Sequence, residues 1–269
     1  MNAQRIKTIL IRVLGERLTA RIQGRRFARI IRRTAVPDPE VELLSRFVAK
    51  GDVTIDVGAN GANWTFWLHR VVGPEGRVFA FEADPYYAMA TQHAIRILRL
   101  KGAHLFPFGL SEKEELVPLR ILDDSNQRVS GLGYVDREAT RDQKEVTIVH
   151  LKPLDSLLAE FPEIQKTSLL KCDVEGYELF VFRGADQLLA TARPTIILEI
   201  GNYEKQGYTA SDVFDFFRKR SYSPFAIVPR GGLSPTDNLL NNSLAISVNR
   251  VLIPEEKVVL VRDLLQIKN

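Results

Sequence analysis

The sequence is poor in cysteine, which limits both its chemistry and its compartment. Cys172 is the only cysteine among 269 residues, so no disulfide can form within the chain and no cysteine-rich zinc cluster can be built. A single thiol is typical of a reducing compartment. Because Cys172 lies in the apolar run from Ser168 to Cys172, we predict a small buried strand residue and not a nucleophile.

Long apolar stretches are also missing. No segment approaches the ~20 apolar residues of a transmembrane helix. The basic N-terminal region contains a short apolar run, Ile9 to Ile11, which Arg12 interrupts before a secretory signal can form. We therefore expect a cytoplasmic protein, either free or peripheral at the inner face of a membrane.

Acidic residues are nearly absent from residues 1–36, which hold ten of the 37 basic residues but only one of the 33 acidic ones, Glu16. The rest of the chain is therefore slightly acidic, although the whole chain has a net charge of +4. Apolar residues recur at spacings of three and four between the arginines, which predicts an amphipathic helix that Gly24 should weaken. Four interpretations stay open: a helix on an anionic membrane surface, a helix packed on the domain, a nucleic-acid contact, or a mitochondrial presequence, which is also rich in arginine and poor in acids. The acidic body disfavours the nucleic-acid contact.

The remaining chain alternates between strand-like and helix-like segments. Apolar runs that predict strands occur at 53–57, 77–81, 103–108, 168–172, 195–200, 223–228 and 243–248. Helical segments separate most of them, which indicates crossover units and a mostly parallel sheet. No helical segment separates the last two, so we expect the last strand to be antiparallel.

These patterns predict an α/β fold with two parts. Residues 1–36 form the basic amphipathic helical segment, and residues 37–269 form one domain with a β-hairpin and loop insertion at about 112–152. The polar stretch at 123–144 within that insertion is either a surface loop or a lid over a ligand.

A glycine-containing turn follows the first predicted strand, in Asp56-Val-Gly-Ala-Asn-Gly61. Glycine lets the backbone turn sharply and approach a ligand, and a helix that starts just after it directs free N–H groups at that ligand. Glu82 ends the second predicted strand, where a carboxylate can accept hydrogen bonds from a ribose diol. Together these features predict a nucleotide-like ligand.

Two kinds of nucleotide-like ligand differ in the residues that they require in this turn. A nicotinamide cofactor prefers Gly-x-Gly-x-x-Gly, but Asn60 and Asn63 stand at the later glycine positions. The charge of Asp56 would repel a pyrophosphate and attract a cationic amino acid end. The turn therefore favours S-adenosylmethionine over a nicotinamide cofactor.

Three stretches resemble the FkbM family of methyltransferases, within roughly residues 38–250. They are Gly51 to Asn60, Gly73 to Glu82, and Leu170 to Glu178 followed by Arg183-Gly-Ala185. The third is the most distinctive, because the fold alone does not require its Lys-x-Asp-x-Glu-Gly-x-Glu pattern. The resemblance implies a Rossmann-like class I methyltransferase fold that binds S-adenosylmethionine. Its sheet would be mostly parallel and seven-stranded, in the order 3-2-1-4-5-7-6, with helices on both faces and an antiparallel last strand.

The resemblance also implies the contacts of the cofactor. It places Asp56, Gly58 and Asn60 around the methionine end, Glu82 at the ribose, and Gly109, Leu110 and Ser111 at the adenine. The other expected cofactor contacts are Ala59, Gly61, Ala83 and Asp173. Two residues depart from the family pattern. Ala62 stands where a second glycine is usual, and Ala83 replaces a usual proline.

Carboxylates at the ends of predicted strands are the candidates for catalysis. Asp173 and Glu199 end two strands and Glu175 follows Asp173 in the loop, at the edge where open α/β sheets bind ligands. Neighbouring carboxylates raise the proton affinity of at least one of them, which makes a plausible base, or they could bind a divalent cation. Asp173 is the first candidate for the base, ahead of Glu175 and Glu199. We expect Glu178 to be a first-turn helix residue.

These features together predict an S-adenosylmethionine-dependent methyltransferase that methylates a hydroxyl group. The family resemblance suggests a sugar, a glycolipid or glycan, or a secondary metabolite as acceptor. The alternative is a non-catalytic membrane-surface adaptor with a degenerate methyltransferase fold, for which Ala62 is the support. The expected partners are a small-molecule or glycan acceptor and an anionic membrane surface contacted by residues 1–36, with nucleic acid disfavoured.

Overall fold

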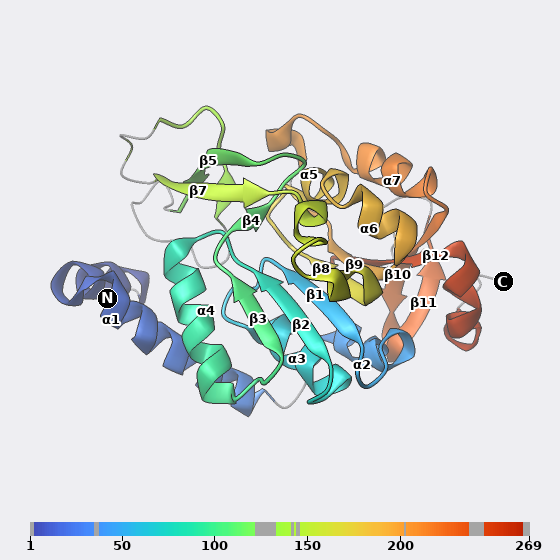
Figure 1. Ribbon diagram of the computed structural model, residues 1–269, viewed down its shortest axis with the longest axis horizontal. Coiled ribbons are helices and arrows are strands. Elements are labelled where there is room, and N and C mark those ends of the chain that lie inside the picture. The colour runs from blue at the N-terminus through green and yellow to red at the C-terminus, as the bar shows by residue number, and fades with distance from the viewer. Residues whose placement is uncertain are drawn as a thin grey trace.

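The computed structural model describes residues 3–34, 38–121, 133–140, 143, 146–201, 203–236 and 245–265. A large twisted sheet occupies the centre with helices on both faces, and a smaller sheet lies above it in the view of Figure 1. Most of the predicted stretch 123–144 falls outside the described residues.

The large sheet has eight strands. In spatial order they are β11 (Gly232–Pro235), β10 (Tyr222–Val228), β12 (Asn249–Pro254), β9 (Thr195–Glu199), β8 (Thr167–Cys172), β1 (Val53–Val57), β2 (Arg77–Phe81) and β3 (Ala103–Phe106). Strand β12 is antiparallel to both of its neighbours and β11 is antiparallel to β10, whereas the other pairs are parallel. Apart from β11, this is the order that the family resemblance implies, so the class I methyltransferase fold is confirmed.

Two details of the strand prediction were wrong. The sheet has eight strands and not seven, because the short edge strand β11 was missed. The antiparallel last strand is Asn249–Pro254 and not residues 243–248. Arg250 explains why this strand was not predicted, since an arginine in a short apolar run argues against a buried strand. In the structure Arg250 is buried, and its guanidinium donates to the backbone carbonyls of Ser247 and Asn249, each at 3.0 Å.

The smaller sheet is built by the predicted insertion and the residues just before it. Its strands, in spatial order, are β4 (Gly109–Leu110), β7 (Val146–Lys152), β5 (Glu115–Arg120) and β6 (Tyr134–Val135). Strands β5 and β7 pair antiparallel over six residue pairs. Strand β4 pairs parallel with β7, which ties this sheet to the loop that leaves β3.

Helices flank the sheets and connect most of the strands. The α-helices are α1 (Ala3–Arg33), α2 (Pro39–Phe47), α3 (Asn63–Val72), α4 (Pro85–Leu98), α5 (Glu178–Arg183), α6 (Asp186–Thr191) and α7 (Ala210–Arg218). The 3₁₀ helices are η1 (Leu154–Leu157), η2 (Pro162–Lys166), η3 (Tyr203–Gln206), η4 (Pro229–Gly231) and η5 (Glu255–Leu264). Within the described chain, no helix combines the length and the apolar composition needed to cross a membrane.

The core lies on both faces of the large sheet, because successive side chains of a strand point to opposite faces. On one face Ile55 packs in a cluster with Phe182 of α5 and Phe217 of α7. On the other, Leu169 packs in a cluster with residues of α2 and α3 that include Leu68. Cys172 is fully buried in the first cluster, as its place in the sequence predicted.

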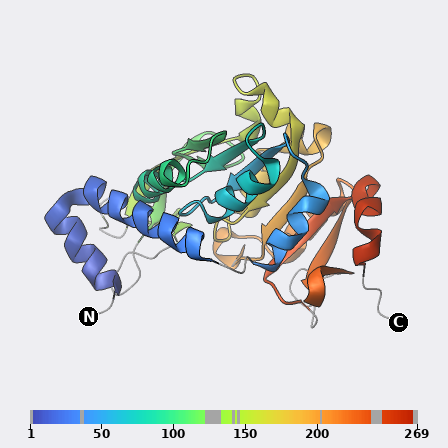
Figure 2. The ribbon, with the colours of Figure 1, turned by 90° about the horizontal axis from the view of Figure 1, so that it is seen from below.

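Helix α1 is bent, as Figure 2 shows. The bend occurs at Gly15, which has φ 77° and ψ 159°, whereas Gly24 lies inside a continuous helix. Gly24 was therefore wrongly predicted as the weak point. A Cβ at Gly24 would lie 2.5 Å from the carbonyl oxygen of Ala90, so this glycine allows α1 and α4 to pack closely, and that packing offsets its low helix propensity.

The predicted apolar face of the N-terminal helix is divided between two environments. Ala20, Ala28 and Ile31 are buried on the side of α1 that packs against the domain. Leu14, Leu18, Ile22 and Ile30 are instead 40–50% exposed. Packing of small residues against α4 therefore fixes the helix and leaves these four larger residues largely in solvent.

Candidate functional site

The register of the parallel strands gathers the candidate residues at one edge of the sheet. Val57, the last residue of β1, pairs with Phe81 of β2 and Cys172 of β8, and Cys172 pairs with Leu198 of β9. The residues that follow these pairs are Gly58, Glu82, Asp173 and Glu199. They lie together at the carboxyl edge, where ligands bind in open α/β sheets.

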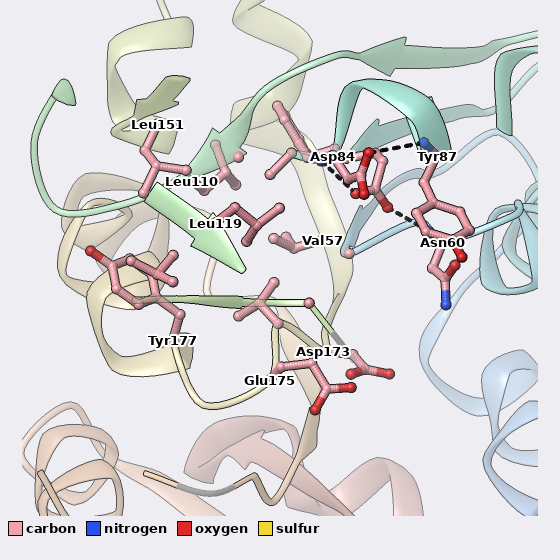
Figure 3. Close-up of a pocket in the computed structure, with 18 of the residues that line it drawn as sticks. Val57, Asn60, Asp84, Tyr87, Leu110, Leu119, Leu151, Asp173, Glu175 and Tyr177 are labelled. Atoms are coloured by element: carbon pink, nitrogen blue, oxygen red, sulfur yellow. Dashed lines mark hydrogen bonds between the residues drawn. The ribbon is translucent and has the colours of Figure 1, made fainter. Parts of the chain in front are cut away.

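Glu82 is held at this edge by two backbone hydrogen bonds. Its Oε2 accepts from the N–H of Asn60 at 3.0 Å, and its Oε1 accepts from the N–H of Asp84 at 2.9 Å (Figure 3). Burial raises the pKa of Glu82 to about 7, although these hydrogen bonds oppose the shift. Each oxygen keeps a lone pair, so the carboxylate can still accept from the two hydroxyls of a ribose.

Gly58 makes the closest approach of two loops in the site. It has φ +85°, and a Cβ at this position would lie 1.9 Å from the carbonyl oxygen of Asp173. The N–H groups of Gly58 and Ala59 both donate to the carbonyl of Phe81 at 3.0 Å. Glycine is therefore required here both by the backbone conformation and by the neighbouring strand end.

Ala62 shows how the departure from the family pattern is accommodated. It adopts the left-handed conformation, with φ 70° and ψ 22°, which costs an L-residue roughly 1–2 kcal/mol and explains why glycine is usual there. Its methyl group is fully buried in one cluster with Ala28 of α1 and Ala94 of α4. Burial by the N-terminal helix therefore offsets part of the strain.

A pocket opens at this edge, and most of the predicted cofactor residues line it. These are Gly58, Asn60, Glu82, Ala83, Gly109, Leu110 and Asp173. The other predicted residues, Asp56, Ala59, Gly61 and Ser111, are not part of its wall. Gly61 donates to Thr91 Oγ1 at 2.8 Å, and Ser111 donates to Glu115 at 2.9 Å and is fully buried. Both therefore support the wall from behind.

The side chain of Asp56 lies behind the wall of the pocket. Its side chain is 1% exposed, and its Oδ2 accepts from Thr65 Oγ1 of α3 at 2.6 Å. Burial raises the pKa of Asp56 to about 6, against the lowering effect of the Thr65 hydrogen bond. Asp56 therefore joins β1 to α3 beneath the glycine turn and lies outside the wall of the pocket, and its contact with the methionine end stays a prediction.

The smaller sheet supplies an apolar wall of the pocket. Leu119, Val135 and Leu151 line it together with Leu110 (Figure 3). A Cβ at Gly109 would lie 2.5 Å from Leu151 Cδ2, so this glycine keeps the space between the two sheets open. The pocket thus has an apolar end suited to an adenine ring, a carboxylate suited to a ribose and a glycine turn, and these features fit S-adenosylmethionine.

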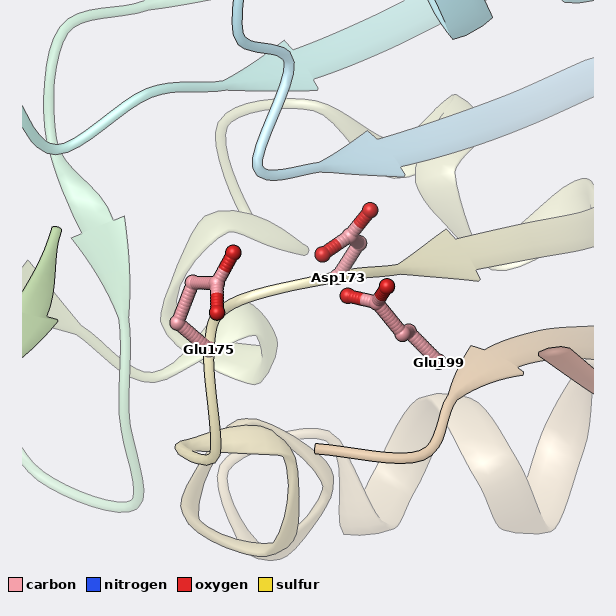
Figure 4. Close-up of side chains that lie close together, drawn as sticks. All are labelled: Asp173, Glu175 and Glu199. Carbon is pink, nitrogen blue, oxygen red and sulfur yellow. The ribbon is translucent and has the colours of Figure 1, made fainter. Parts of the chain in front are cut away.

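The three predicted catalytic carboxylates meet at the opposite side of the pocket. Oxygen atoms of Asp173, Glu175 and Glu199 all lie within 4.8 Å of one another (Figure 4). This spacing would also suit a divalent cation bound through carboxylate oxygens. The buried ammonium group of Lys171 lies beside these acids. Its Nζ is 3.4 Å from Asp173 Oδ2 and 5.5 Å from the ring centre of Trp64.

These neighbours separate the proton affinities of the three acids. Burial alone would raise the pKa of Asp173, but the Lys171 ammonium and hydrogen bonds from Glu199 and Lys171 lower it. The hydrogen bond to Asp173, together with burial, raises the pKa of Glu199. The contact between the two carboxylates therefore favours the ionised form of Asp173 and the protonated form of Glu199. Burial and the charges of Asp173 and Glu178 raise the pKa of Glu175 to about 7.

Glu175 differs from Asp173 and Glu199 because its carboxylate is not held by a hydrogen bond within the described chain. Its backbone has φ 56°, a strained conformation that turns the loop after β8. Among the residues that the structure describes, none hydrogen-bonds its carboxylate. A half-buried carboxylate with a pKa near neutrality and no hydrogen-bond partner in the described chain is suited to accept a proton.

Some site residues were missed by sequence reasoning. Lys171 is 1% exposed near the end of β8, and a lysine inside an otherwise apolar strand was a signal for a buried ion pair. Tyr87 and Tyr177 also line the pocket, but no spacing in the sequence indicated this. Glu178 begins α5 as expected, and its Oε1 accepts from the N–H of Val174 at 3.0 Å.

Helix α1 supports the cofactor turn from outside the pocket. Phe27 fills the space beside Gly61, because its ring carbons lie 2.9 Å from where a Cβ at Gly61 would be. Its ring is also 6.4 Å from that of Tyr87, which lines the pocket. The N-terminal helix therefore contacts both the turn and one wall residue.

We expect Phe27→Ala to weaken both the fold and cofactor binding. Removing a half-buried ring should lower the free energy of unfolding by about 2 kcal/mol, less than for a fully buried phenylalanine, and should loosen the turn at Gly61. Thermal unfolding and titration with S-adenosylmethionine measure the two effects. Ile30→Ala is the matched control, since Ile30 lies on the same helix and is 50% exposed. Equal behaviour of the two variants would contradict a supporting role for Phe27.

Comparisons with known proteins agree with this geometry. Residues 56–224 match the model of the methyltransferase FkbM domain. Methyltransferase 1 of Beauveria bassiana (strain ARSEF 2860) is 27% identical over 145 residues, which cover 49% of this chain and 57% of that protein. The match thus spans little more than half the length of this relative.

Two solved structures are also similar. The methyltransferase FkbM from Methylobacillus flagellatus KT has a TM-score of 0.44 at 16% identity, covering 66% of this chain and 40% of that chain. The SAM-dependent O-methyltransferase from Thermotoga maritima has a TM-score of 0.42 at 14% identity, covering 82% and 66%. The family model covers more than half of the chain, and the chain therefore belongs to the methyltransferase FkbM domain family.

Proposed function

We propose that the chain is an S-adenosylmethionine-dependent O-methyltransferase. The acceptor would be a hydroxyl group on a sugar, a glycan or glycolipid, or a secondary metabolite. One observation carries the proposal: a single pocket is lined both by Glu82, which is suited to a ribose, and by the free carboxylate of Glu175. The same pocket therefore offers a place for a nucleoside cofactor and a group that can accept a hydroxyl proton.

The chain's own residues would hold and shield the cofactor. Glu82 would accept from the ribose hydroxyls, Asn60 and Gly58 would border the methionine end, and the apolar wall of Leu119, Val135 and Leu151 would exclude water around the adenine. When bound, S-adenosylmethionine supplies an electrophilic methyl group. The protein then needs mainly to align an acceptor oxygen with it.

Glu175 is the better candidate for the general base, ahead of Asp173. A base works best when its pKa lies near the operating pH, and Glu175 has a pKa of about 7. Asp173 is already engaged by Lys171 and Glu199, so we assign it a positioning role. In this arrangement Glu175 takes the proton of the acceptor hydroxyl, while Glu199 donates to Asp173 and keeps that carboxylate in place.

Methyl transfer to matched acceptors tests the proposal. The purified chain is incubated with isotopically labelled S-adenosylmethionine and pairs of sugars, glycans and phenols that carry either a hydroxyl or an amino group at the same position. We expect label in the hydroxyl compounds, located on oxygen by mass spectrometry. Label on the amino compounds alone would sink the O-methyltransferase proposal while keeping the cofactor.

A further inference from the structure

We propose that the outer face of α1, the exposed side of residues 14–33, docks on an anionic lipid bilayer. The inner side of this helix is fixed to the domain through Ala20, Gly24 and Ala28, so the outer face has a defined orientation. The proposal concerns this surface alone and does not depend on the identity of the methyl acceptor.

The outer face carries large apolar side chains that the fold leaves uncovered. Leu14, Leu18, Ile22 and Ile30 are 40–50% exposed. Their burial in the domain is prevented because the opposite side of the helix already packs against α4. An amphipathic helix with Leu and Ile exposed among basic residues is suited to lie in the plane of a membrane interface, with its apolar side chains at the level of the acyl chains.

The charge of this face is almost entirely positive. Seven exposed arginines lie between residues 17 and 33, and Glu16 is the only acid of residues 1–36. In the described part of the chain, none of these arginines pairs with a carboxylate; Arg32 donates to the backbone carbonyl of Ile97 at 2.7 Å. Unpaired arginines that remain hydrated in the free protein can contribute their full attraction to an anionic surface.

Two hollows beside α1 are lined mainly by its arginines. One, between α1 and α4, is lined by Arg17, Arg21 and Arg96 together with His93. Burial and the positive field of Arg25, Arg21 and Arg96 lower the pKa of His93. The other hollow is lined by Arg25, Arg29, Arg32 and Arg33. Both are suited to the phosphate groups of lipid headgroups.

The pattern favours a bilayer over a nucleic acid. Proteins that bind single strands without sequence preference present aromatic side chains for stacking. On residues 14–33 the only aromatic side chain is Phe27, which packs beside Gly61. The remainder of the chain beyond residue 36 holds more acidic than basic residues, which opposes a wide contact with a polyanion.

Vesicle co-sedimentation of the full chain tests the proposal. The vesicles are phosphatidylcholine alone and phosphatidylcholine mixed with phosphatidylglycerol, at low and at physiological salt. Two double variants separate the contributions, Leu18→Ser with Ile22→Ser, and Arg25→Gln with Arg29→Gln. The controls are Leu116→Ser on β5, where Leu116 is 71% exposed, and Arg262→Gln in η5. Unchanged thermal unfolding and S-adenosylmethionine binding establish that each variant is folded.

We expect the chain to bind the anionic vesicles and not phosphatidylcholine alone, with binding that weakens as salt increases. Each arginine removed should weaken binding by about fivefold, the serine double variant should weaken it severalfold, and the controls should bind as the wild type does. Equal binding to both vesicles, no binding at low salt, or wild-type binding by both double variants would overturn the proposal. So would tighter binding to duplex DNA or transfer RNA that is insensitive to the serine substitutions.

Discussion

Gly58→Ala is expected to lower the free energy of unfolding by about 2–5 kcal/mol, or to prevent accumulation of folded protein. The left-handed backbone at this position, with φ +85°, disfavours alanine by roughly 1–2 kcal/mol. The added Cβ would also lie 1.9 Å from the carbonyl oxygen of Asp173. A backbone atom cannot move aside as a flexible side chain can, so overpacking adds roughly 1–3 kcal/mol.

Gly51→Ala separates these two causes. Gly51 has φ +89°, but a Cβ there would meet nothing within 4 Å. This variant should therefore show the backbone cost alone in urea and thermal unfolding. If Gly58→Ala loses no more stability than Gly51→Ala, a Cβ at position 58 does not clash with the carbonyl of Asp173, and the close approach of the glycine turn to the end of β8 is contradicted.

Glu175→Gln is expected to lower kcat by about two to four orders of magnitude, the range for loss of a general base. Affinity for S-adenosylmethionine should change little, because Glu82 and the glycine turn hold the other end of the pocket. A glutamine keeps the size of the side chain but cannot accept the proton of an acceptor hydroxyl. Initial rates at saturating cofactor measure the loss.

The pH dependence of kcat/KM tests whether Glu175 is the general base. In the wild type, kcat/KM for the acceptor should fall as pH drops below about 7, because protonated Glu175 cannot serve as a base. Glu175→Gln should show no such fall. The control is Glu204→Gln in η3, where Glu204 is exposed. A wild-type profile in Glu175→Gln would assign the base to another residue, with Asp173→Asn as the next variant to measure.

The residues at the carboxyl edge could be predicted because parallel strands end together. The runs that became β1, β2, β8 and β9 were each recognisable, and the residues that follow them meet wherever the strands are neighbours. Glu82, Asp173 and Glu199 were therefore found from the sequence. The proton affinities of Asp173 and Glu199 could not be predicted, because they depend on Lys171, whose burial beside Asp173 only the structure shows.

Side-chain direction and helix packing were harder to predict. Asp56 belongs to β1, and the alternation of the strand directs its side chain to Thr65 of α3, which the turn motif alone does not reveal. Gly15 and Gly24 are equally unfavourable in an isolated helix. Gly24 contacts α4 and stays helical, whereas Gly15 has no such contact among the described residues and is where the helix bends.

Titration calorimetry with S-adenosylmethionine tests the central claim, that this pocket is a cofactor site, most directly. The wild type should bind S-adenosylmethionine and S-adenosylhomocysteine but not NAD. Glu82→Gln should weaken binding by about 10–100-fold, the effect of losing hydrogen bonds to a charged group. Glu75→Gln should bind normally, since Glu75 is exposed before the start of β2. Two results would contradict a cofactor site in this pocket. One is a folded wild-type protein that binds neither S-adenosylmethionine nor S-adenosylhomocysteine, and the other is equal affinity of the wild type and Glu82→Gln for S-adenosylmethionine.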